Sequence, residues 1–331
     1  MKIILDAMGG DNAPQAAVAG AYLAAEKYGC EVVLVGDTEK VTPLMKNNPA
    51  VTLVHASEVI ENEEKATAAV RGKKDSSMSK ALSMLANGEG DAVISAGSTG
   101  ALLTGATLIV KRVKGVRRGA LGTLLPTKTG SCLLCDVGAN SECTAEYLLQ
   151  FAYLGSIYME KVAGIKNPRV ALLNNGTEEG KGAPLQKESF ELIKSAENLN
   201  FVGNIEGRDI FSGDADVIVC DGFSGNIALK TMEGTAKMVM RELKSALTAS
   251  ALSSIRALLA KPKLNSLKDK LDYKKIGGAP FLGISKPVIK AHGSSDENAF
   301  CAAVFQAIKF AQSGYTEAVC EKISEMTVKK D

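Results

Sequence analysis

The feature that most constrains this chain is a junction that it builds repeatedly: a short apolar run ends at a polar residue, and glycine follows. The clearest copy spans residues 216–230. Residues 217–220 are apolar with no polar alternation, which is typical of a strand covered on both faces. The run ends at Asp221, and the glycine-rich turn 222–226 leads into a segment of helical character. A ligand commonly binds at such a junction, where a helix N-terminus offers N–H groups to an anion.

The same junction follows at least five expected strands. The expected strands are residues 2–5, 32–35, 51–54, 92–94, 120–125, 132–135, 170–173 and 217–220. The polar residues that end five of them are Asp6, Ser95, Asp136, Asn174 and Asp221. Helical stretches separate the strands, which predicts an α/β fold with a mostly parallel sheet. We therefore expect the five loops to meet at one edge of the sheet and to form a single site.

Length and composition narrow the class of protein. With 331 residues, 46% of them apolar, the chain can bury a large core, and we interpret residues 1–331 as a single α/β domain. A net charge of +2 does not predict nucleic-acid binding. No apolar run approaches the roughly 20 residues of a membrane span, and the N-terminus does not resemble a signal peptide. We expect a cytoplasmic protein that is able to lie against a membrane.

The cysteines and histidines do not predict a metal site. Seven cysteines in a chain rich in valine, isoleucine and leucine suggest reduced, buried thiols. Cys132 and Cys135 form one isolated C-x-x-C within an expected strand, so their side chains should point to opposite faces. The only histidines are His55 and His292, and zinc binding is therefore not expected.

Nucleotide fingerprints are also weak. No G-x-G-x-x-G follows an expected strand, and residues 176–182 resemble a P-loop that is one residue short and lacks the magnesium-binding hydroxyl. Residues 97–100 open a helix, and with Lys181 on a nearby loop they suit a small anion such as phosphate. The alternative is that Ser98 or Thr99 only caps the helix and Lys181 is solvated.

Taken together, the loops resemble a known family, the bacterial phosphate acyltransferases. The motifs that carry the resemblance are DAMGGDNAP (6–14), SAGSTGA (95–101), DVGAN (136–140), GNIEGRD (203–209), DGFSGN (221–226) and HGSS (292–295). One departure is Ser98, where the family usually has asparagine. The resemblance implies a three-layer α/β/α sandwich, a homodimer, and no metal, nucleotide or other cofactor. It also implies that acyl-[acyl carrier protein] and inorganic phosphate are converted to acyl phosphate, which a membrane glycerol-3-phosphate acyltransferase then uses for phospholipid synthesis.

Phosphate is already an anionic nucleophile, so the implied reaction needs positioning and charge stabilisation more than a strong base. We predict that Lys181 neutralises phosphate or the developing oxyanion and that Asn226 donates a hydrogen bond to either. His292 either protonates the departing thiolate or holds the 293–295 turn. The residues expected to bind phosphate or to order the surrounding loops are Asp6, Gly9, Gly10, Ser98, Thr99, Asp136, Asn140, Asp221 and Ser224. Cys220 lies within its strand and is interpreted as a buried thiol.

A second feature is an apolar stripe in the segment 240–275, which we expect to protrude as an amphipathic helix. The stripe consists of Leu243, Leu247, Ala251, Ile255, Leu258 and Leu259, and a lysine-rich run follows it. Leu247, Ile255, Leu258 and Leu259 should contact either a dimer partner or an anionic membrane surface. A separate basic cluster at 111–118 either receives the acidic carrier protein or is only solvated.

Two rival functions stay open at this stage. A decarboxylating dehydrogenase would share the sheet architecture, but it needs grouped arginines and clustered aspartates that the sequence does not show. A non-catalytic scaffold for acyl carrier protein or lipid would bind the carrier without any phosphate-dependent loss of the thioester.

Overall fold

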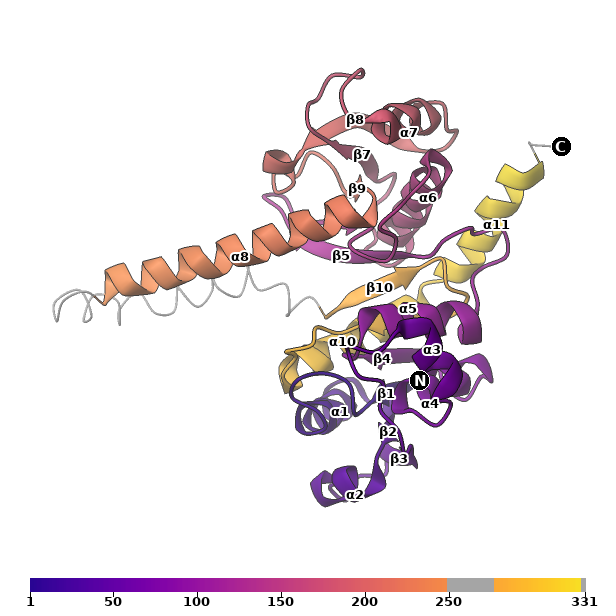
Figure 1. Ribbon diagram of the computed structural model, residues 1–331, viewed down its shortest axis with the longest axis vertical. Coiled ribbons are helices and arrows are strands. Elements are labelled where there is room, and N and C mark those ends of the chain that lie inside the picture. The colour runs from indigo at the N-terminus through magenta and orange to yellow at the C-terminus, as the bar shows by residue number, and fades with distance from the viewer. Residues whose placement is uncertain (249–276, 329–331) are drawn as a thin grey trace.

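The computed structural model describes residues 1–248 and 277–328, and its framework is one sheet of eleven strands (Figure 1). From one edge to the other the order is β3 (Val51–His55), β2 (Glu31–Gly36), β1 (Lys2–Asp6), β4 (Ala92–Ser95), β11 (Val288–Lys290), β10 (Ala279–Leu282), β5 (Ala120–Pro126), β6 (Ser131–Cys135), β9 (Val217–Val219), β7 (Arg169–Asn174) and β8 (Asn200–Glu206). All eight expected strands are present, and β8, β10 and β11 are additional.

The sheet contains two parallel blocks that run in opposite directions. The first block consists of five mutually parallel strands: β3, β2, β1, β4 and β11. The second block consists of four mutually parallel strands: β6, β9, β7 and β8. The pairs β11–β10, β10–β5 and β5–β6 between them are antiparallel. The prediction of a mostly parallel sheet is confirmed. The expectation that five carboxyl ends share one edge is wrong, because three successive antiparallel pairings reverse the second block relative to the first.

Helices cover both faces of the sheet, as expected for three layers. One face is packed by α1 (Gln15–Tyr28), α6 (Ala145–Lys161), α7 (Pro184–Lys194), α10 (Glu297–Gln312) and α11 (Tyr315–Val328). The other is packed by α3 (Ala66–Gly72), α4 (Ser77–Ala86), α5 (Thr99–Gly105), its π-helical continuation η2 (Ala106–Val110) and the first turns of α8 (Gly222–Leu247). Successive strand residues alternate between the two faces. Cys132 and Cys135 accordingly point to opposite cores, as predicted.

The last part of the chain returns to the first block. Strand β11 pairs with β4, and α10 packs against α1. This helix contact is close because position 20 is glycine: a Cβ there would lie 2.5 Å from the Cβ of Phe300. Residues from the two ends of the sequence therefore build one half of the molecule together (Figure 1).

Helix α8 leaves the body of the protein as a long arm (Figure 1). It has 26 residues and is about 39 Å long at 1.5 Å per residue. Only Gly222, Gly225 and Glu233 are buried along it. The arm thus begins well before position 240, the expected start of the protruding segment. Leu247 lies half-buried near its end. Ile255, Leu258 and Leu259 lie outside the described residues.

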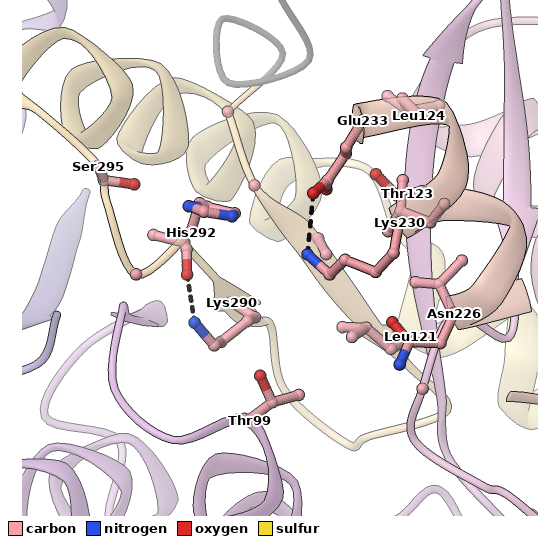
Figure 2. A pocket seen from close by; sticks show the side chains of 18 of the residues that line it. Thr99, Leu121, Thr123, Leu124, Asn226, Lys230, Glu233, Lys290, His292 and Ser295 are labelled. Atoms are coloured by element: carbon pink, nitrogen blue, oxygen red, sulfur yellow. Dashed lines mark hydrogen bonds and ion pairs between the residues drawn. The ribbon is translucent and has the colours of Figure 1, made fainter. Parts of the chain in front are cut away.

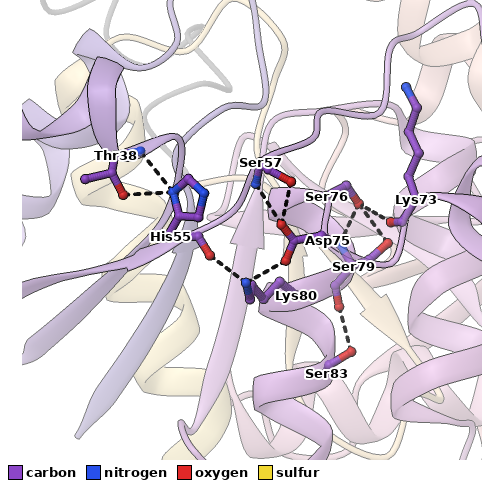
Figure 3. A network of polar contacts seen from close by, with 9 residues as sticks. All are labelled: Thr38, His55, Ser57, Lys73, Asp75, Ser76, Ser79, Lys80 and Ser83. Atoms are coloured by element: carbon purple, nitrogen blue, oxygen red, sulfur yellow. Dashed lines mark hydrogen bonds and ion pairs between the residues drawn. The ribbon is translucent and has the colours of Figure 1, made fainter.

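A polar network ties the segment after β3 to the start of α4 (Figure 3). The ammonium of Lys80 donates to a carboxylate oxygen of Asp75 at 2.6 Å and to the carbonyl of His55 at 2.7 Å, and Asp75 also accepts from Ser57. These contacts, led by the one from Lys80, hold the pKa of Asp75 well below its usual range. The His55 ring takes part through Nδ1, which lies 2.8 Å from the hydroxyl of Thr38 (Figure 3).

Among the described helices, none has the length and apolar character that crossing a membrane requires.

Candidate functional site

A cavity of about 370 Å³ lies between the two strand blocks (Figure 2). One wall comes from the loops after β4 and β11, with Thr99, Lys290 and His292. The opposite wall comes from α8 and the loop after β6, and β5 and β10 supply apolar surface between them, including Leu121 and Leu124. Residues that follow strands of both blocks therefore line the same cavity, although the two blocks run in opposite directions.

Helix α8 presents three polar side chains to the cavity. Asn226, Lys230 and Glu233 are spaced by four and three residues, which places them on one face of the helix. The Nζ atom of Lys230 lies 3.0 Å from a carboxylate oxygen of Glu233, whose side chain is only 8% exposed (Figure 2). The helix begins at Asp221, whose carboxylate accepts a hydrogen bond from the backbone N–H of Ser224 at 2.9 Å.

Two glycines bring the start of α8 into contact with the loop after β6. A Cβ at Gly225 would lie 1.9 Å from the carbonyl oxygen of Asp136, and one at Gly222 would lie 2.5 Å from the carbonyl oxygen of Asn140. No real Cβ atom tolerates such distances. Glycine at both positions therefore sets how closely Asn226 approaches the loop.

The buried carboxylate of Asp136 organises that loop. One oxygen accepts from the backbone N–H groups of Leu121, Gly138 and Ala139, at 2.9–3.1 Å. The other accepts from the backbone and side-chain amides of Asn140, at 2.7 and 2.9 Å. Burial raises the pKa of Asp136, and these hydrogen bonds oppose the rise. With five donors around it, Asp136 orders the loop.

Lys290 is the central feature of the opposite wall. Its ammonium donates to the carbonyl oxygen of Ala96 at 3.1 Å and to that of Ala291 (Figure 2). Burial lowers the pKa of Lys290 to about 8; the charge of Asp6 opposes this change, and the charge of Lys230 adds to it. Two ammonium groups from facing walls therefore repel one another across the cavity. An anion bound between them would relieve this repulsion.

The residues around Lys290 hold two loops together. Asp6 is buried and accepts from the hydroxyl of Ser95 at 2.6 Å. Burial raises the pKa of Asp6, against the effect of its hydrogen bonds. Gly9 and Gly10 lie against residues 96–97, where a Cβ on either would come closer than 3.0 Å to backbone or side-chain atoms.

His292 lines the cavity and also holds its own turn. Its Nδ1 accepts from the backbone N–H of Ser294 at 3.1 Å and lies 2.9 Å from the hydroxyl of the same residue. Because a backbone N–H only donates, Nδ1 is the acceptor nitrogen, and in the neutral ring the proton is on Nε2.

The structure brings three of the predicted site residues to the cavity: Thr99, Asn226 and His292. The predicted residues that shape the loops around it are Asp6, Gly9, Gly10, Ser98, Asp136, Asn140, Asp221 and Ser224. One expectation differs from the structure: the N-terminus of α8 does not present a row of free N–H groups. The N–H groups of Gly222, Ser224 and Gly225 are bonded within the protein.

Lys181 lies elsewhere, on the loop that follows β7. Its side chain is 51% exposed, its Nζ lies 3.8 Å from Glu178, and it does not line the cavity. Its predicted contact with phosphate requires the 174–182 loop to move toward the cavity, and that role stays a prediction.

Sequence reasoning missed Lys230, Glu233, Lys290 and Ser295, which all line the cavity. A signal for Lys230 was present, since it follows Asn226 by four residues in an expected helix. Lys290 lies on a strand that the sequence did not reveal.

Cys220, which directly precedes Asp221, is a buried thiol. The Sγ atom of Cys220 lies 3.3 Å from the carbonyl oxygen of Asp136, and burial raises the pKa of this thiol far above its ordinary value. Within residues 1–248 and 277–328, no group of histidine, cysteine, aspartate and glutamate side chains is arranged to hold a metal ion.

Comparison with solved structures places the fold. A phosphotransacetylase from Streptococcus pyogenes is similar, with a TM-score of 0.61 and 21% identity over 95% of this chain and 94% of that one. A 4-hydroxythreonine-4-phosphate dehydrogenase from Klebsiella pneumoniae also aligns, with a TM-score of 0.55 and 13% identity over 94% and 99% of the two chains. At these identities the likeness shows the architecture alone, an α/β fold shared by enzymes of different chemistry.

Comparison of sequences identifies the family. A family described as "Fatty acid synthesis protein" matches residues 1–318. The phosphate acyltransferase of Bacillus pumilus is 49% identical over 99% of both chains, and that of Clostridioides difficile is 46% identical over 98% of this chain and 97% of its own. The chain therefore belongs to this family of fatty acid synthesis proteins and is an acyltransferase enzyme of the phosphate acyltransferase type.

Proposed function

We propose that the enzyme transfers the acyl group of acyl-[acyl carrier protein] to inorganic phosphate and releases acyl phosphate and the free carrier. The observation that carries this proposal is the convergence of Lys230 and Lys290 from facing walls of one cavity. Apolar side chains such as Leu121 and Leu229 line the same space, so it suits an anion beside an acyl chain.

In the proposed step, a phosphate oxygen attacks the thioester carbonyl carbon and the carbonyl electron pair moves onto oxygen. The tetrahedral intermediate collapses, the carbon–sulfur bond breaks, and its electron pair leaves with the carrier sulfur. The proton of hydrogen phosphate ends on that sulfur, so the products are acyl phosphate and the free thiol. Lys230 and Lys290 position phosphate, and the side-chain amide of Asn226 donates to the oxyanion.

No covalent acyl-enzyme is needed in this scheme, because phosphate itself is the nucleophile. The burial of the Cys220 thiol supports direct attack, because burial raises its pKa and disfavours the nucleophilic thiolate. In this scheme the Nε2–H of His292 donates a hydrogen bond to the departing sulfur, which takes its proton from the hydrogen phosphate.

The direct test uses purified enzyme, acyl-[acyl carrier protein] and phosphate labelled with ¹⁸O. We expect acyl phosphate that carries the labelled phosphate oxygens, together with one free carrier thiol for each molecule formed. Mass spectrometry of the product and a thiol assay measure the two quantities. Binding of the carrier without loss of the thioester would instead support the scaffold function.

We also propose a homodimer in which the exposed arm of α8 lies against a second copy. We further propose that the dimer binds an anionic membrane surface, where a membrane acyltransferase takes up the product. Phe223, Ile227 and Met238 are 50–61% exposed and fall within about 60° of one another around the helix. A dimer would cover this apolar face.

Met238→Glu should therefore convert a dimer to a monomer in light scattering, because it buries a charge in the interface. Val239→Glu, about 100° further around the same helix, is the matched control and should leave the dimer intact. A Met238→Glu protein that stays dimeric but no longer sediments with anionic vesicles would show that this face contacts lipid instead.

A further inference from the structure

A second cavity shares the loop after β6 with the first. It has a volume of about 200 Å³ and is lined by three arginines and three threonines, Arg71, Arg112, Arg118, Thr67, Thr104 and Thr107, which we call the arginine pocket. The loop after β6 separates the two cavities: Val137 and Gly138 line the first, and Ala139 and Asn140 line the second. The helix α5–η2 lines both cavities as well: Thr99 faces the first, and the second is lined by Leu103, Thr104, Thr107 and Leu108.

The arginine pocket concentrates positive charge without neutralising it. Its lining contains no aspartate or glutamate among the described residues, and no ion pair there involves Arg71, Arg112 or Arg118. Arg112 donates to the carbonyl of Arg117, and Arg118 lies over the ring of Tyr147. Elsewhere the chain neutralises an arginine fully, as where Arg169 makes two hydrogen bonds to the carboxylate of Asp216.

This combination of groups matches a phosphate ester. Guanidinium groups bind phosphate oxygens through paired N–H donors, and threonine hydroxyls supply further hydrogen bonds. The thioester of a carrier protein is at the end of a pantetheine arm, and a phosphodiester joins that arm to the protein. Because the arm separates the two groups, a ligand whose thioester lies in the first cavity has its phosphodiester outside that cavity.

The surroundings favour a carrier protein over a small thioester. Lys111 and Lys114 are exposed beside the arginine pocket on the same 111–118 segment, and Leu108 at its rim is 45% exposed. An acidic protein surface would meet this basic and partly apolar rim while the arm enters the pocket.

We propose that the arginine pocket binds the phosphodiester of the carrier protein's pantetheine arm while the thioester occupies the cavity between the strand blocks. The proposal rests on the function proposed above, because it takes the carrier thioester as the substrate. It assigns to Arg71 and Arg118 the recognition of the arm and no part in the chemical step.

The test compares the carrier protein with and without its arm. The wild-type enzyme should bind the holo carrier, which bears the arm, roughly ten- to a hundredfold more tightly than the apo carrier, the gain expected from charge-assisted hydrogen bonds. The double variant Arg71→Gln/Arg118→Gln should lose that difference in calorimetry. Arg208→Gln, an exposed arginine paired with Glu206 away from the pocket, is the control and should keep it. A thermal melt checks that each variant is folded.

Kinetics separate this proposal from the function on which it rests. The double variant should raise the KM for acyl-[acyl carrier protein] by a similar factor and keep kcat. Its rate with an acyl-N-acetylcysteamine thioester, which has no phosphate, should match that of the wild type.

If the variant still prefers the holo carrier, or loses activity equally with both thioesters, the pocket is not a phosphodiester site. A loss confined to acyl-coenzyme A would assign the pocket to that small thioester and overturn the carrier assignment. If wild-type enzyme forms no acyl phosphate at all, the proposed function fails, and the comparison of holo and apo binding still tests the pocket.

Discussion

Lys290→Met should lower the rate of acyl phosphate formation by about a hundred- to a thousandfold, the usual effect of removing a charged donor from a transition state. The ammonium of Lys290 is buried and faces Lys230 across the cavity, so its loss removes one of the two cations that position phosphate. Steady-state kinetics with phosphate as the varied substrate measure the effect. The fold should be unaffected, because methionine fills a similar volume and removes a buried charge.

The dependence on pH provides an independent check of Lys290. Its pKa in the folded protein is about 8, below the ordinary value of 10.5. The amine is cationic below pH 8 and neutral above it, so the KM for phosphate should rise as pH passes through 8. Between pH 8 and 10.5 the unfolded chain binds more protons at this residue than the folded one, so its contribution to stability increases with pH. Both trends should disappear in Lys290→Met. If the variant keeps the wild-type KM for phosphate, Lys290 is not a phosphate ligand.

Gly225→Ala should impair both stability and activity, because a single methyl group there has no space. The new Cβ would lie 1.9 Å from the carbonyl oxygen of Asp136 and 2.7 Å from the Sγ of Cys220. The helix must therefore move away from the loop, at a cost of about 1–3 kcal/mol for overpacking. Asn226 follows directly and moves with the helix, and a displacement of about 1 Å is enough to lower the rate roughly a hundredfold. Urea unfolding and kcat measure the two effects.

Gly234→Ala is the matched control for this prediction. Gly234 lies in the same helix, on the apolar face proposed to meet a second copy, and within one copy a Cβ there would meet no atom within 4 Å. Alanine is a better helix former than glycine by about 0.8–1.0 kcal/mol, so this variant should be slightly more stable than the wild type and fully active. Equal behaviour of the two variants would show that the close approach of α8 to the loop does not matter.

The fold class was predictable because buried parallel strands have a strong signature. Apolar runs such as 217–220 have no polar alternation, and each ends at a polar residue and glycine. The three strands that were missed lack this signature. β10 contains Pro280, β11 has only three residues after Pro287, and β8 is interrupted by Gly203.

The missed strands explain what could not be predicted about the site. If β10 and β11 are not recognised, nothing in the sequence indicates the three antiparallel pairings that reverse the second block. The five glycine-rich loops are then expected to share one edge of the sheet, which is wrong. Lys290 lies on β11, so its position in the cavity was hidden as well. Asn226 and His292 were accessible to sequence reasoning because each adjoins a glycine-containing turn: Asn226 ends the turn 222–226, and His292 precedes the turn 293–295. Lys181 follows such a turn too, but β7 is two strands away from β6 and its loop does not reach the cavity.

The return of the chain to its first block has a consequence for synthesis on the ribosome. Until β11 emerges, β4 has an unpaired edge, and until α10 follows, one side of α1 is bare. Lys290 and His292 arrive with these late segments, after the opposite wall and α8 are already translated. The growing chain is therefore exposed to unwanted strand pairing for most of its synthesis, and it gains its cavity only near the end.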